Sequence, residues 1–275
     1  MGTLGDIRIA FIGGGTMAEA FLRGLLGKEL CTPTQLVASD PLPQRREHLT
    51  STLGIQAVSS NKEAIAEAGI VVLAVKPQVL SAVLEELAWQ IAPETLVLSI
   101  VTGATIERIR TALGTKAVVR IMPNTPGQIG EGISVWTATP ETSVEQRAQA
   151  QQIISALGEE VYVEHEDYLD MATALSGSGP AYVFLFIEAL IDAGVRMGFS
   201  RAMAAKLALQ TVRGAAIFAQ RSGKHPAILR NMVTSPGGTT AEALYHLEKG
   251  GFRALISQAI WAAYEKAKYL GELDK

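Results

Sequence analysis

Two glycine-rich segments of this 275-residue chain have residue types that can bind an anion. The first, Gly13-Gly-Gly-Thr-Met-Ala18, follows the apolar run Ile9–Ile12 and fits the pattern G-x-G-x-x-A. The second is Ser235-Pro-Gly-Gly-Thr-Thr240. Glycine lets backbone N–H groups approach a ligand closely, and the N-terminus of a helix attracts negative charge. Both segments are therefore candidate sites for charged groups of a ligand.

The first segment is typical of the turn that binds the pyrophosphate of a dinucleotide. Gly13 allows the tight turn, Gly15 lets backbone amides approach the phosphates, and Ala18 allows the helix to pack closely on the strand. The amphipathic stretch Met17–Leu26 follows, so the turn opens a helix. An ordinary glycine-rich turn is the alternative. The strand before it and the helix after it favour a nicotinamide dinucleotide.

The end of the second predicted strand gives conflicting signals about which dinucleotide binds. Asp40 follows the apolar run Leu36–Ser39, where a carboxylate accepts hydrogen bonds from the adenosine ribose and favours NAD. Arg45 and Arg46 follow closely, and a guanidinium there can contact the 2′-phosphate of NADP. Solvated helix residues are an equal alternative for both arginines. The sequence leaves NADPH and NADH open as cofactors.

The second segment predicts the start of a helix in the C-terminal part of the chain. Thr239 followed by Glu242 is typical of a capping box, which predicts that Gly238, Thr239 and Thr240 lie at a helix N-terminus. Free backbone amides at that position can hold a substrate carboxylate. A glycine-rich turn between two helices is an equal alternative.

Other catalytic chemistries have little support in the sequence. The four histidines are dispersed and no HExxH or CxxC motif occurs, so we expect no metal. No G-x-S-x-G motif for acyl transfer occurs either. Cys31 is the only cysteine, so an intrachain disulfide is impossible, and we expect it to be a small buried hydrophobe. This cysteine usage fits a reducing cytoplasm.

The composition is that of a globular protein, with 48% hydrophobic and 19% charged residues. The net charge is −3 and the basic residues are scattered among acidic ones, which argues against nucleic acid or a membrane surface as a partner. The N-terminal residues do not resemble a secretory signal. The most apolar stretch, Ala181–Val195, contains two acidic residues and is expected to be too short to span a bilayer. We expect a soluble protein that acts on a small molecule.

β-Branched runs alternate with helical stretches in the first part of the chain, which predicts an α/β fold with a mostly parallel, Rossmann-type sheet covered on both faces. The predicted strands are Ile7–Ile12, Leu36–Ser39, Ile70–Val75, Leu96–Ile100, Val118–Ile121, Ile133–Thr137 and Val161–Val163. After Glu164 the strand signal ends and the sequence is typical of helices. We therefore predict a dinucleotide-binding domain over residues 1–164 and an all-helical domain over residues 165–275.

One predicted helix of the second domain, Ala181–Leu190, is apolar on almost every side. A surface helix of a small bundle does not need this pattern, so we expect it to be buried on several sides, with a second subunit as one way to cover it. The segment Ser176–Pro180 directly precedes this helix. Its glycines and proline either break the chain or let the backbone pass close to a ligand.

Six segments together resemble the Δ1-pyrroline-5-carboxylate reductases. They are Phe11–Ala18, Ala74–Pro77, Met122–Pro126, Gly130–Gly132, Ala174–Tyr182 and Ser235–Thr240. The likeness runs over nearly the whole chain, and the last two motifs in this order are specific to that family. It implies NAD(P)H-dependent reduction of the cyclic imine 1-pyrroline-5-carboxylate to L-proline, with hydride passing from nicotinamide C4 to ring C5. It also implies helical domains that interlock as homodimers, often assembled into decamers.

The resemblance implies roles for individual residues. Backbone groups of Gly238 and Thr239 would hold the substrate carboxylate, and the Thr240 hydroxyl would bond to the ring nitrogen as the catalytic group. Some members have a glutamate that contacts the substrate region where this chain has Gly223, so this chain lacks the side chain for that contact. The cofactor-binding residues would be Ile12, Gly13, Gly14, Gly15, Thr16 and Met17 on the pyrophosphate, Asp40 on the ribose, and Asn61, Ala74, Val75, Lys76, Pro77, Ile100 and Thr102 along the remaining cleft.

Three alternatives follow from the same residues. Lys76 lies at the end of a predicted strand and can be considered as a proton donor, although a cofactor or structural contact is the stronger interpretation. A β-hydroxyacid dehydrogenase has a similar layout but uses a lysine in a Gly-x-x-Lys pattern, for which we find no convincing candidate. A nucleotide sensor without turnover would not need the intact segment Ser235–Thr240.

Overall fold

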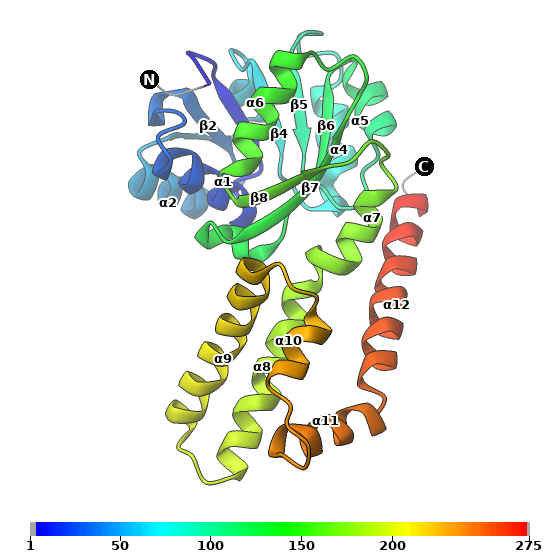
Figure 1. Cartoon of the computed structure of the whole chain (residues 1–275). Coiled ribbons are helices and arrows are strands. Elements are labelled where there is room, and N and C mark those ends of the chain that lie inside the picture. The colour runs from blue at the N-terminus through cyan, green and yellow to red at the C-terminus, as the bar shows by residue number, and fades with distance from the viewer. Residues whose placement is uncertain (1–3, 274–275) are drawn as a thin grey trace. The chain divides into compact units, whose positions relative to one another are not determined.

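The computed structural model describes residues 4–273 and divides into two compact units (Figure 1). The first unit comprises Met1–Ser178 and Ala263–Lys275, and the second comprises Gly179–Ala262. Contacts within the chain define these units, whereas the end of the strand signal defines the predicted boundary after residue 164. The first unit contains the whole sheet and the glycine turn, and the second contains helices.

The first unit is built on a single mixed sheet. Its order is β3(Gln56–Val58), β2(Leu36–Ser39), β1(Ile9–Ile12), β4(Ile70–Leu73), β5(Leu96–Ser99), β6(Val118–Met122), β7(Gly132–Ala138) and β8(Gly158–Tyr162). Among these described strands, every neighbouring pair is parallel except β6 and β7. The order reverses between β1 and β4. Open α/β sheets bind ligands at the carboxyl ends of strands beside such a point.

Helices cover both faces of the sheet, as the alternation of buried residues requires (Figure 1). Phe11 of β1 packs in one apolar cluster, and its neighbour Ile12 packs in the other. The helices α1(Thr16–Gly27), α2(Pro43–Leu53) and α6(Val144–Ser155) contribute to the first cluster. The helices α3(Asn61–Ile65), α4(Pro77–Leu87) and α5(Ile106–Leu113) contribute to the second. The predicted Rossmann-type architecture is confirmed.

Two strands depart furthest from the prediction. The edge strand β3 was not predicted, because it is short, begins with the exposed Gln56 and lacks a β-branched run. The last strand, β8, begins three residues earlier than the predicted Val161, since Gly158–Glu160 pairs with β7 despite its two glutamates. Pairing with the neighbouring strand determines where both strands form, whereas local residue preference does not.

The chain after β8 is entirely helical within the described residues, as predicted. It contains α7(Tyr168–Ala172), the π-helix η3(Thr173–Gly177), α8(Gly179–Arg196), α9(Arg201–Ser222), α10(Pro226–Met232), α11(Thr239–Lys249) and α12(Phe252–Leu273). Helices α8 and α9 approach closely, since a methyl group on Gly194 would lie 2.9 Å from Ala204 Cβ.

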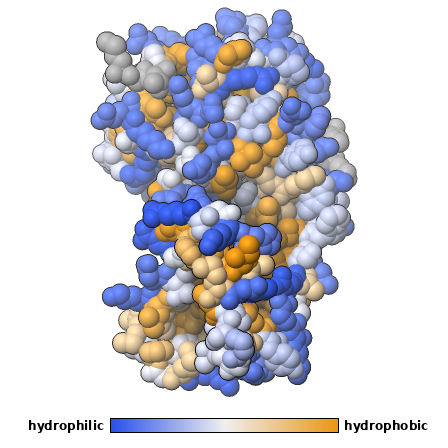
Figure 2. All heavy atoms as spheres, in the orientation of Figure 1, coloured by the Kyte–Doolittle hydropathy of each residue, from blue (hydrophilic) through white to orange (hydrophobic). Residues whose placement is uncertain are grey.

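The surface of the second unit is unusually apolar. Phe184 and Leu185 of α8 are 61% and 67% exposed, and Gly194 is the one fully buried residue of this helix. Orange, hydrophobic side chains interrupt the polar surface of the helical part in Figure 2. Exposed apolar side chains in such number mark an interaction surface.

The helical run that contains α8 is longer than the sequence predicted. It extends from Tyr168 to Arg196, 29 residues, and is long and apolar enough to cross a membrane by length and composition. The apolar stretch Ala181–Val195 is thus part of a longer helical run than the sequence predicted. The reason is that η3 does not break the helix. Ser178 N–H bonds to the carbonyl of Thr173 five residues earlier, so the chain passes through Ser176–Pro180 without leaving the helical path.

Candidate functional site

The glycine turn after β1 is sterically specific. Gly13 has φ +95°, and a methyl group there would lie 2.8 Å from the carbonyl oxygen of Ala74 and 2.9 Å from Val75 Cγ1. The Gly13 N–H donates to the carbonyl of Ser39 at 3.0 Å. Any side chain would therefore push the turn off the adjoining strand ends. The same contacts bring Ala74 and Val75, both predicted cofactor residues, beside the turn.

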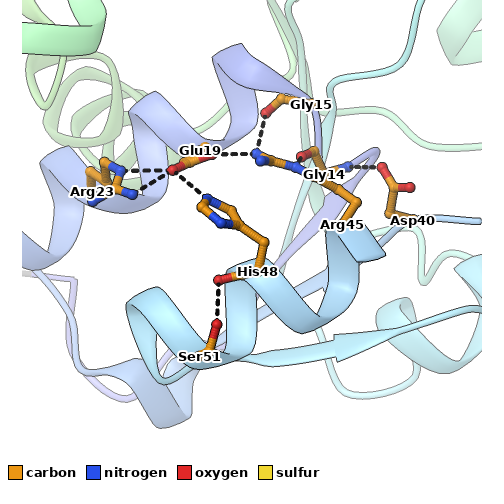
Figure 3. Close-up of polar contacts among 8 residues, drawn as sticks. All are labelled: Gly14, Gly15, Glu19, Arg23, Asp40, Arg45, His48 and Ser51. Carbon is orange, nitrogen blue, oxygen red and sulfur yellow. Dashed lines mark hydrogen bonds and ion pairs between the residues drawn. The ribbon is translucent and has the colours of Figure 1, made fainter. Parts of the chain in front are cut away.

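The next residue, Gly14, is held at both its N–H and its carbonyl by charged side chains (Figure 3). Its N–H donates to Asp40 Oδ2 at 3.1 Å, and its carbonyl accepts a hydrogen bond from Arg45 Nε. Asp40 Oδ1 also accepts from the Leu42 N–H at 2.9 Å. A methyl group on Gly14 would lie 2.8 Å from Leu49 Cδ1. The predicted ribose carboxylate thus also fixes the turn.

Gly15 is the N-cap residue of α1 and leaves the helix end open. Its backbone is extended, with φ −67° and ψ −177°. Among the described residues, no heavy atom lies within 4 Å of the position that a Cβ would take. Glycine has no side chain to cap the first N–H groups, which include those of Thr16 and Met17, and these groups have no partner within the helix. The open cradle fits a pyrophosphate.

Glu19 of α1 joins this turn to α2 (Figure 3). Arg45 Nη2 donates to Glu19 Oε2 at 2.5 Å and to the carbonyl of Gly15 at 3.3 Å. The other carboxylate oxygen accepts from Arg23 Nε at 2.8 Å and lies 3.1 Å from His48 Nε2. Burial by itself would raise the pKa of Glu19, but the hydrogen bonds from Arg23, Arg45 and His48 and the charge of Arg45 lower it to about 2. Glu19 is ionised at neutral pH.

The two arginines after β2 are not simply solvated. Arg45 makes the contacts above, and Arg46 Nη1 donates to the carbonyls of Asp40 at 2.8 Å and Pro41 at 2.9 Å. Both side chains are only half-buried. Both guanidinium groups thus bond to the backbone around the predicted ribose position, and both residues lie in α2.

Asn61, a predicted cofactor residue, is oriented by two neighbours. Its Oδ1 accepts a hydrogen bond from Ser39 Oγ at 2.7 Å, and its Nδ2 donates to Glu86 Oε2 at 2.7 Å. Ser39 is fully buried at the end of β2. The amide is thus fixed beside the strand end from which Asp40 follows.

The other predicted cofactor residues lie at neighbouring strand ends. Ala74 N–H donates to the carbonyl of Ile12 at 2.8 Å, which continues the β1–β4 pairing up to the turn. Lys76 is exposed and is the N-cap residue of α4, and Pro77 is the first residue of that helix. The Lys76 side chain makes no capping hydrogen bond to this helix.

A small hollow of about 200 Å³ collects the remaining predicted residues. Met17, Ile100 and Thr102 line it together with Met122–Thr125 and Gly177. Asn124 fixes one wall, since its Nδ2 donates to the carbonyl of Ser176 at 3.1 Å and its Oδ1 accepts from Ile133 N–H at 3.0 Å. The motif Met122–Pro126 thus contributes Met122–Thr125 to the lining of this hollow.

Gly177 has a steric reason to be glycine. A methyl group there would lie 2.5 Å from Met122 Cε. The segment Ser176–Pro180 therefore allows close packing beside the hollow and is not a simple break in the chain.

The second glycine segment lies at the start of α11, as predicted. Gly237 has φ +69°, and the Gly238 N–H donates to the carbonyl of Ser235 at 3.0 Å. Gly238 is the N-cap residue, with φ −81° and ψ 166°, and a methyl group there would lie 2.5 Å from Ser235 Oγ. Thr239 is exposed and Thr240 is half-buried.

The predicted capping box at this helix is wrong. Thr239 is the first helical residue, whereas a capping residue must lie outside the helix. The helix begins one residue earlier than the capping box requires, and its N-cap residue is a glycine. Glu242 lies 3.3 Å from His246 Nε2 instead of folding back on the helix start. The first amides of α11 therefore have no side-chain cap from Gly238.

Gly223 ends α9 in the left-handed conformation, with φ +61°. Its N–H donates to the carbonyl of Ala219 at 3.2 Å. A glutamate in this position would adopt a backbone conformation that L-residues disfavour. Gly223 thus terminates α9.

Other reactive groups are few. Within residues 4–273, no three His, Cys, Asp or Glu side chains are grouped so that they can hold a metal ion. Cys31 is buried, as predicted, and burial raises the pKa of its thiol to about 11. A thiol in this state is a poor nucleophile at neutral pH.

Comparisons with known proteins agree with this arrangement. The family described as pyrroline-5-carboxylate reductase dimerisation matches residues 166–270, and the family described as NADP oxidoreductase coenzyme F420-dependent matches residues 8–103. A pyrroline-5-carboxylate reductase of Synechocystis sp. is 43% identical over 97% of this chain and 99% of its own length.

Solved structures extend the similarity to three dimensions. The pyrroline-5-carboxylate reductase of Coxiella burnetii has a TM-score of 0.89 at 36% identity, over 96% of this chain and 98% of its own. The Plasmodium falciparum enzyme, solved with NADP bound, has a TM-score of 0.88 at 33% identity with the same coverage. On the strength of the glycine cradle, the helical C-terminal part and identity along almost its whole length, this chain belongs to the pyrroline-5-carboxylate reductase family.

Proposed function

We propose that the chain catalyses the NAD(P)H-dependent reduction of 1-pyrroline-5-carboxylate to L-proline. The observation that carries this proposal is the glycine cradle of β1 and α1 in a chain that is 43% identical to a pyrroline-5-carboxylate reductase over nearly its full length. The cradle would hold a dinucleotide because Gly13 and Gly14 leave no room for side chains and Gly15 leaves the helix end open. A relative of known structure has NADP bound.

NAD(P)H, when bound, supplies the hydride that reduces C5 of the cyclic imine. The chain's own task is to position the reactants, since an imine protonated on nitrogen is already an electrophile. Residues Ile12–Met17 would hold the pyrophosphate and Asp40 the adenosine ribose. Met17, Ile100 and Thr102 line one hollow beside the turn, and this hollow would take part of the dinucleotide. Ala74, Val75, Lys76, Pro77 and Asn61 would line the rest of the cleft.

The start of α11 would bind the substrate. The first N–H groups of this helix, which include those of Thr239 and Thr240, are suited to a carboxylate. The hydroxyl of Thr240, the second helical residue, would orient the imine nitrogen and act as the catalytic group. Because a glycine caps the helix, no side chain competes with the substrate for these donors.

The division of labour follows from the two kinds of structure in the chain. We propose that residues 1–164 bind the dinucleotide and that residues 165–275 bind the substrate and form the dimer. The match of residues 166–270 to a dimerisation family supports pairing through the helices. The exposed apolar side chains of α8, such as Phe184 and Leu185, would be covered by the second subunit rather than by lipid.

Further assembly of the dimers into a decamer and a cytoplasmic location are part of the same proposal. The decamer is inferred from the family, and the cytoplasmic location is inferred from the cysteine usage. Light scattering of the purified protein distinguishes a dimer from a decamer.

The decisive experiment follows the loss of NADPH absorbance with 1-pyrroline-5-carboxylate as substrate. We expect L-proline to form in a one-to-one ratio with oxidised cofactor. A 3-hydroxy acid that reduces NADP in place of this reaction would favour a dehydrogenase of the β-hydroxyacid type. Dinucleotide binding without turnover of either substrate would favour a sensor. The Thr240→Val variant is the matched control for contaminating enzymes.

A further inference from the structure

Arg45 makes several contacts that compete with one another for its guanidinium group (Figure 3). Its Nε donates to the carbonyl of Gly14, and its Nη2 is shared between the carbonyl of Gly15 and the carboxylate of Glu19. Gly14 also donates its N–H to Asp40. Arg45 and Asp40 therefore bond to the same residue, Asp40 to its N–H and Arg45 to its carbonyl.

Arg45 bonds to Gly14, the residue whose N–H also bonds to the Asp40 carboxylate. In Rossmann-type domains the carboxylate at the end of the second strand faces the adenosine ribose, and an arginine nearby accommodates the 2′-phosphate of NADP. Arg46 is tied to the carbonyls of Asp40 and Pro41, on the strand side of the loop. Of the two arginines, Arg45 is the one that a second acidic side chain holds.

That acidic side chain is Glu19, and its hold on Arg45 is stronger than that of an ordinary surface ion pair. The side chain of Glu19 is 16% exposed and that of Arg45 is 23% exposed, and the N···O distance is 2.5 Å. Arg23 and His48 contact the same carboxylate from its other side and fix its orientation. A 2′-phosphate, with a charge of about −1.5 to −2, would have to share Arg45 with Glu19 and would be repelled by it.

We propose that Glu19 is a positioning residue that sets the cofactor preference: by holding Arg45 on the glycine turn, it lowers the affinity for NADPH relative to NADH. The proposal rests on the proposed function, because it assumes that the cradle binds a nicotinamide dinucleotide. Glu19 acts through Arg45 and does not itself touch the cofactor. Removing its charge frees the guanidinium for the 2′-phosphate and leaves the Gly14 peptide held by Asp40.

The test is a set of dissociation constants for NADPH and NADH, measured by calorimetry on the full-length protein. The variant Glu19→Gln keeps the length and polarity of the side chain but removes the charge. We expect it to shift the affinity ratio toward NADPH by about three- to tenfold, as expected when one partly exposed ion pair is lost. NADH affinity should change less than twofold.

Two further variants distinguish an effect transmitted through Arg45 from the general effect of removing a negative charge. Glu47→Gln removes an equal charge from the exposed face of α2 and should leave the ratio unchanged. In the Arg45→Ala background, Glu19→Gln should no longer shift the ratio. A shift that persists without Arg45, or an equal loss of both cofactors in Glu19→Gln, would overturn the proposal. A thermal melt of each variant shows whether the fold is intact.

The same titrations distinguish this proposal from the proposed function. If the unaltered protein binds neither dinucleotide, the proposed function is wrong. If it binds both and Glu19→Gln leaves their ratio unchanged, the role of Glu19 is wrong and the function stands.

Discussion

Helices α1 and α11 begin with almost the same backbone but in different surroundings. Each has a glycine N-cap in an extended conformation, Gly15 with φ −67° and Gly238 with φ −81°. Each is preceded by a glycine with positive φ, Gly13 or Gly237. Neither N-cap has a side chain that can satisfy the first amides of its helix. Both helix ends are therefore available to an anion.

The surroundings of the two turns differ in how completely one chain fixes them. The first turn is bonded to Ser39, Asp40 and Arg45 and lies against the strand end at Ala74. The second lies in an exposed stretch in which Met232 is 58% and Val233 is 66% exposed. The first is a finished cradle, whereas the second is an open surface that a substrate and a second subunit would complete.

The first prediction breaks the finished cradle. Gly13→Ala places a methyl group 2.8 Å from the Ala74 carbonyl and forces an L-residue to keep φ +95°. We expect this to cost roughly 2–4 kcal/mol, which is about a hundredfold in NADPH affinity if it falls on the bound turn. Calorimetry measures the loss of NADPH affinity, and thermal melting measures the loss of stability.

Gly15→Ala is the matched control for this prediction. Its methyl group would meet no described atom and its φ suits any residue, so the melting temperature should stay the same. Cofactor affinity should still fall, because the methyl group occupies the space left for the pyrophosphate. Unchanged affinity in Gly15→Ala would show that the phosphates do not approach this residue.

The second prediction concerns the open surface of the helical part. Replacing Phe184 and Leu185 together by Asp places two charges on the face that we propose is covered by the partner. Burying unpaired charges should weaken the dimer by roughly a thousandfold or more, and activity should be lost with it. Light scattering at micromolar concentration measures the mass.

Val144→Asp is the matched control for the dimer. Val144 is 87% exposed at the start of α6, in the first unit, so this variant should remain a fully active dimer. A monodisperse and fully active monomer of the unaltered protein would contradict the assembly that we propose.

The third prediction separates the two threonines of α11. Thr240→Val keeps the branched shape and the backbone amide but removes the hydroxyl, so kcat should fall more than substrate binding. The loss of one hydrogen bond to a charged group is worth about 1.5–3 kcal/mol, or roughly ten- to a hundredfold in rate. Thr240→Ser should keep much of the activity. Steady-state kinetics with varied substrate measure both parameters.

Thr239→Val is the control within the same helix end. Because Gly238 is the N-cap residue, the Thr239 hydroxyl does not cap the helix, and we expect little change in either stability or kcat. If Thr239→Val abolishes activity while Thr240→Val does not, the two roles are reversed. If neither matters, the start of α11 is not the substrate site.

The finished cradle could be predicted from sequence and the open surface only in part. The turn at Gly13 depends on neighbours in sequence, an apolar strand before it and a helix after it. Glu19 was missed because its partners Arg45 and His48 lie 26 and 29 residues further along the chain. The signal that was present, an acidic residue in the first turn of α1, is common to many helices.

Local sequence patterns also gave wrong predictions of where helices begin and end. Thr239 and Glu242 have the spacing of a capping box, but the helix starts one residue earlier and leaves the pattern unused. The proline and glycines around Ser178 are typical of a break, but a π-type turn carries the helix through them. Both outcomes depend on where a helix begins, which a short pattern does not determine.

The fourth prediction concerns the loop between β2 and α2. Replacing Arg45 and Arg46 by Ala should weaken NADPH binding by about tenfold more than NADH binding, since each can supply a charged hydrogen bond to a 2′-phosphate. Both cofactors should support turnover of the unaltered protein, with NADPH modestly preferred. Competitive titration measures the ratio. An equal loss with both cofactors would show that neither arginine touches the 2′-phosphate.

The smallest expected effect is the pH dependence of stability that Glu19 confers on the cradle. Its pKa is lowered from 4.5 to about 2 in the folded chain, because the stabilising hydrogen bonds from Arg23, Arg45 and His48 outweigh burial. A lowered pKa means that the stabilisation is complete above pH 4.5 and is lost as the pH falls toward 2. In this partly solvated network it amounts to about 1–2 kcal/mol.

Melting temperatures between pH 5 and pH 3 test this prediction, since the difference between the unaltered protein and Glu19→Gln should narrow as the pH falls. The comparison uses the difference between two proteins, so carboxylates common to both cancel. Ser235–Thr240 has no such charge network in the described structure, so a matched substitution there, Glu242→Gln, should leave the pH dependence unchanged. Glu242 is exposed and meets only His246 on its own helix. A constant difference over this range would mean that the charge of Glu19 does not stabilise the first turn.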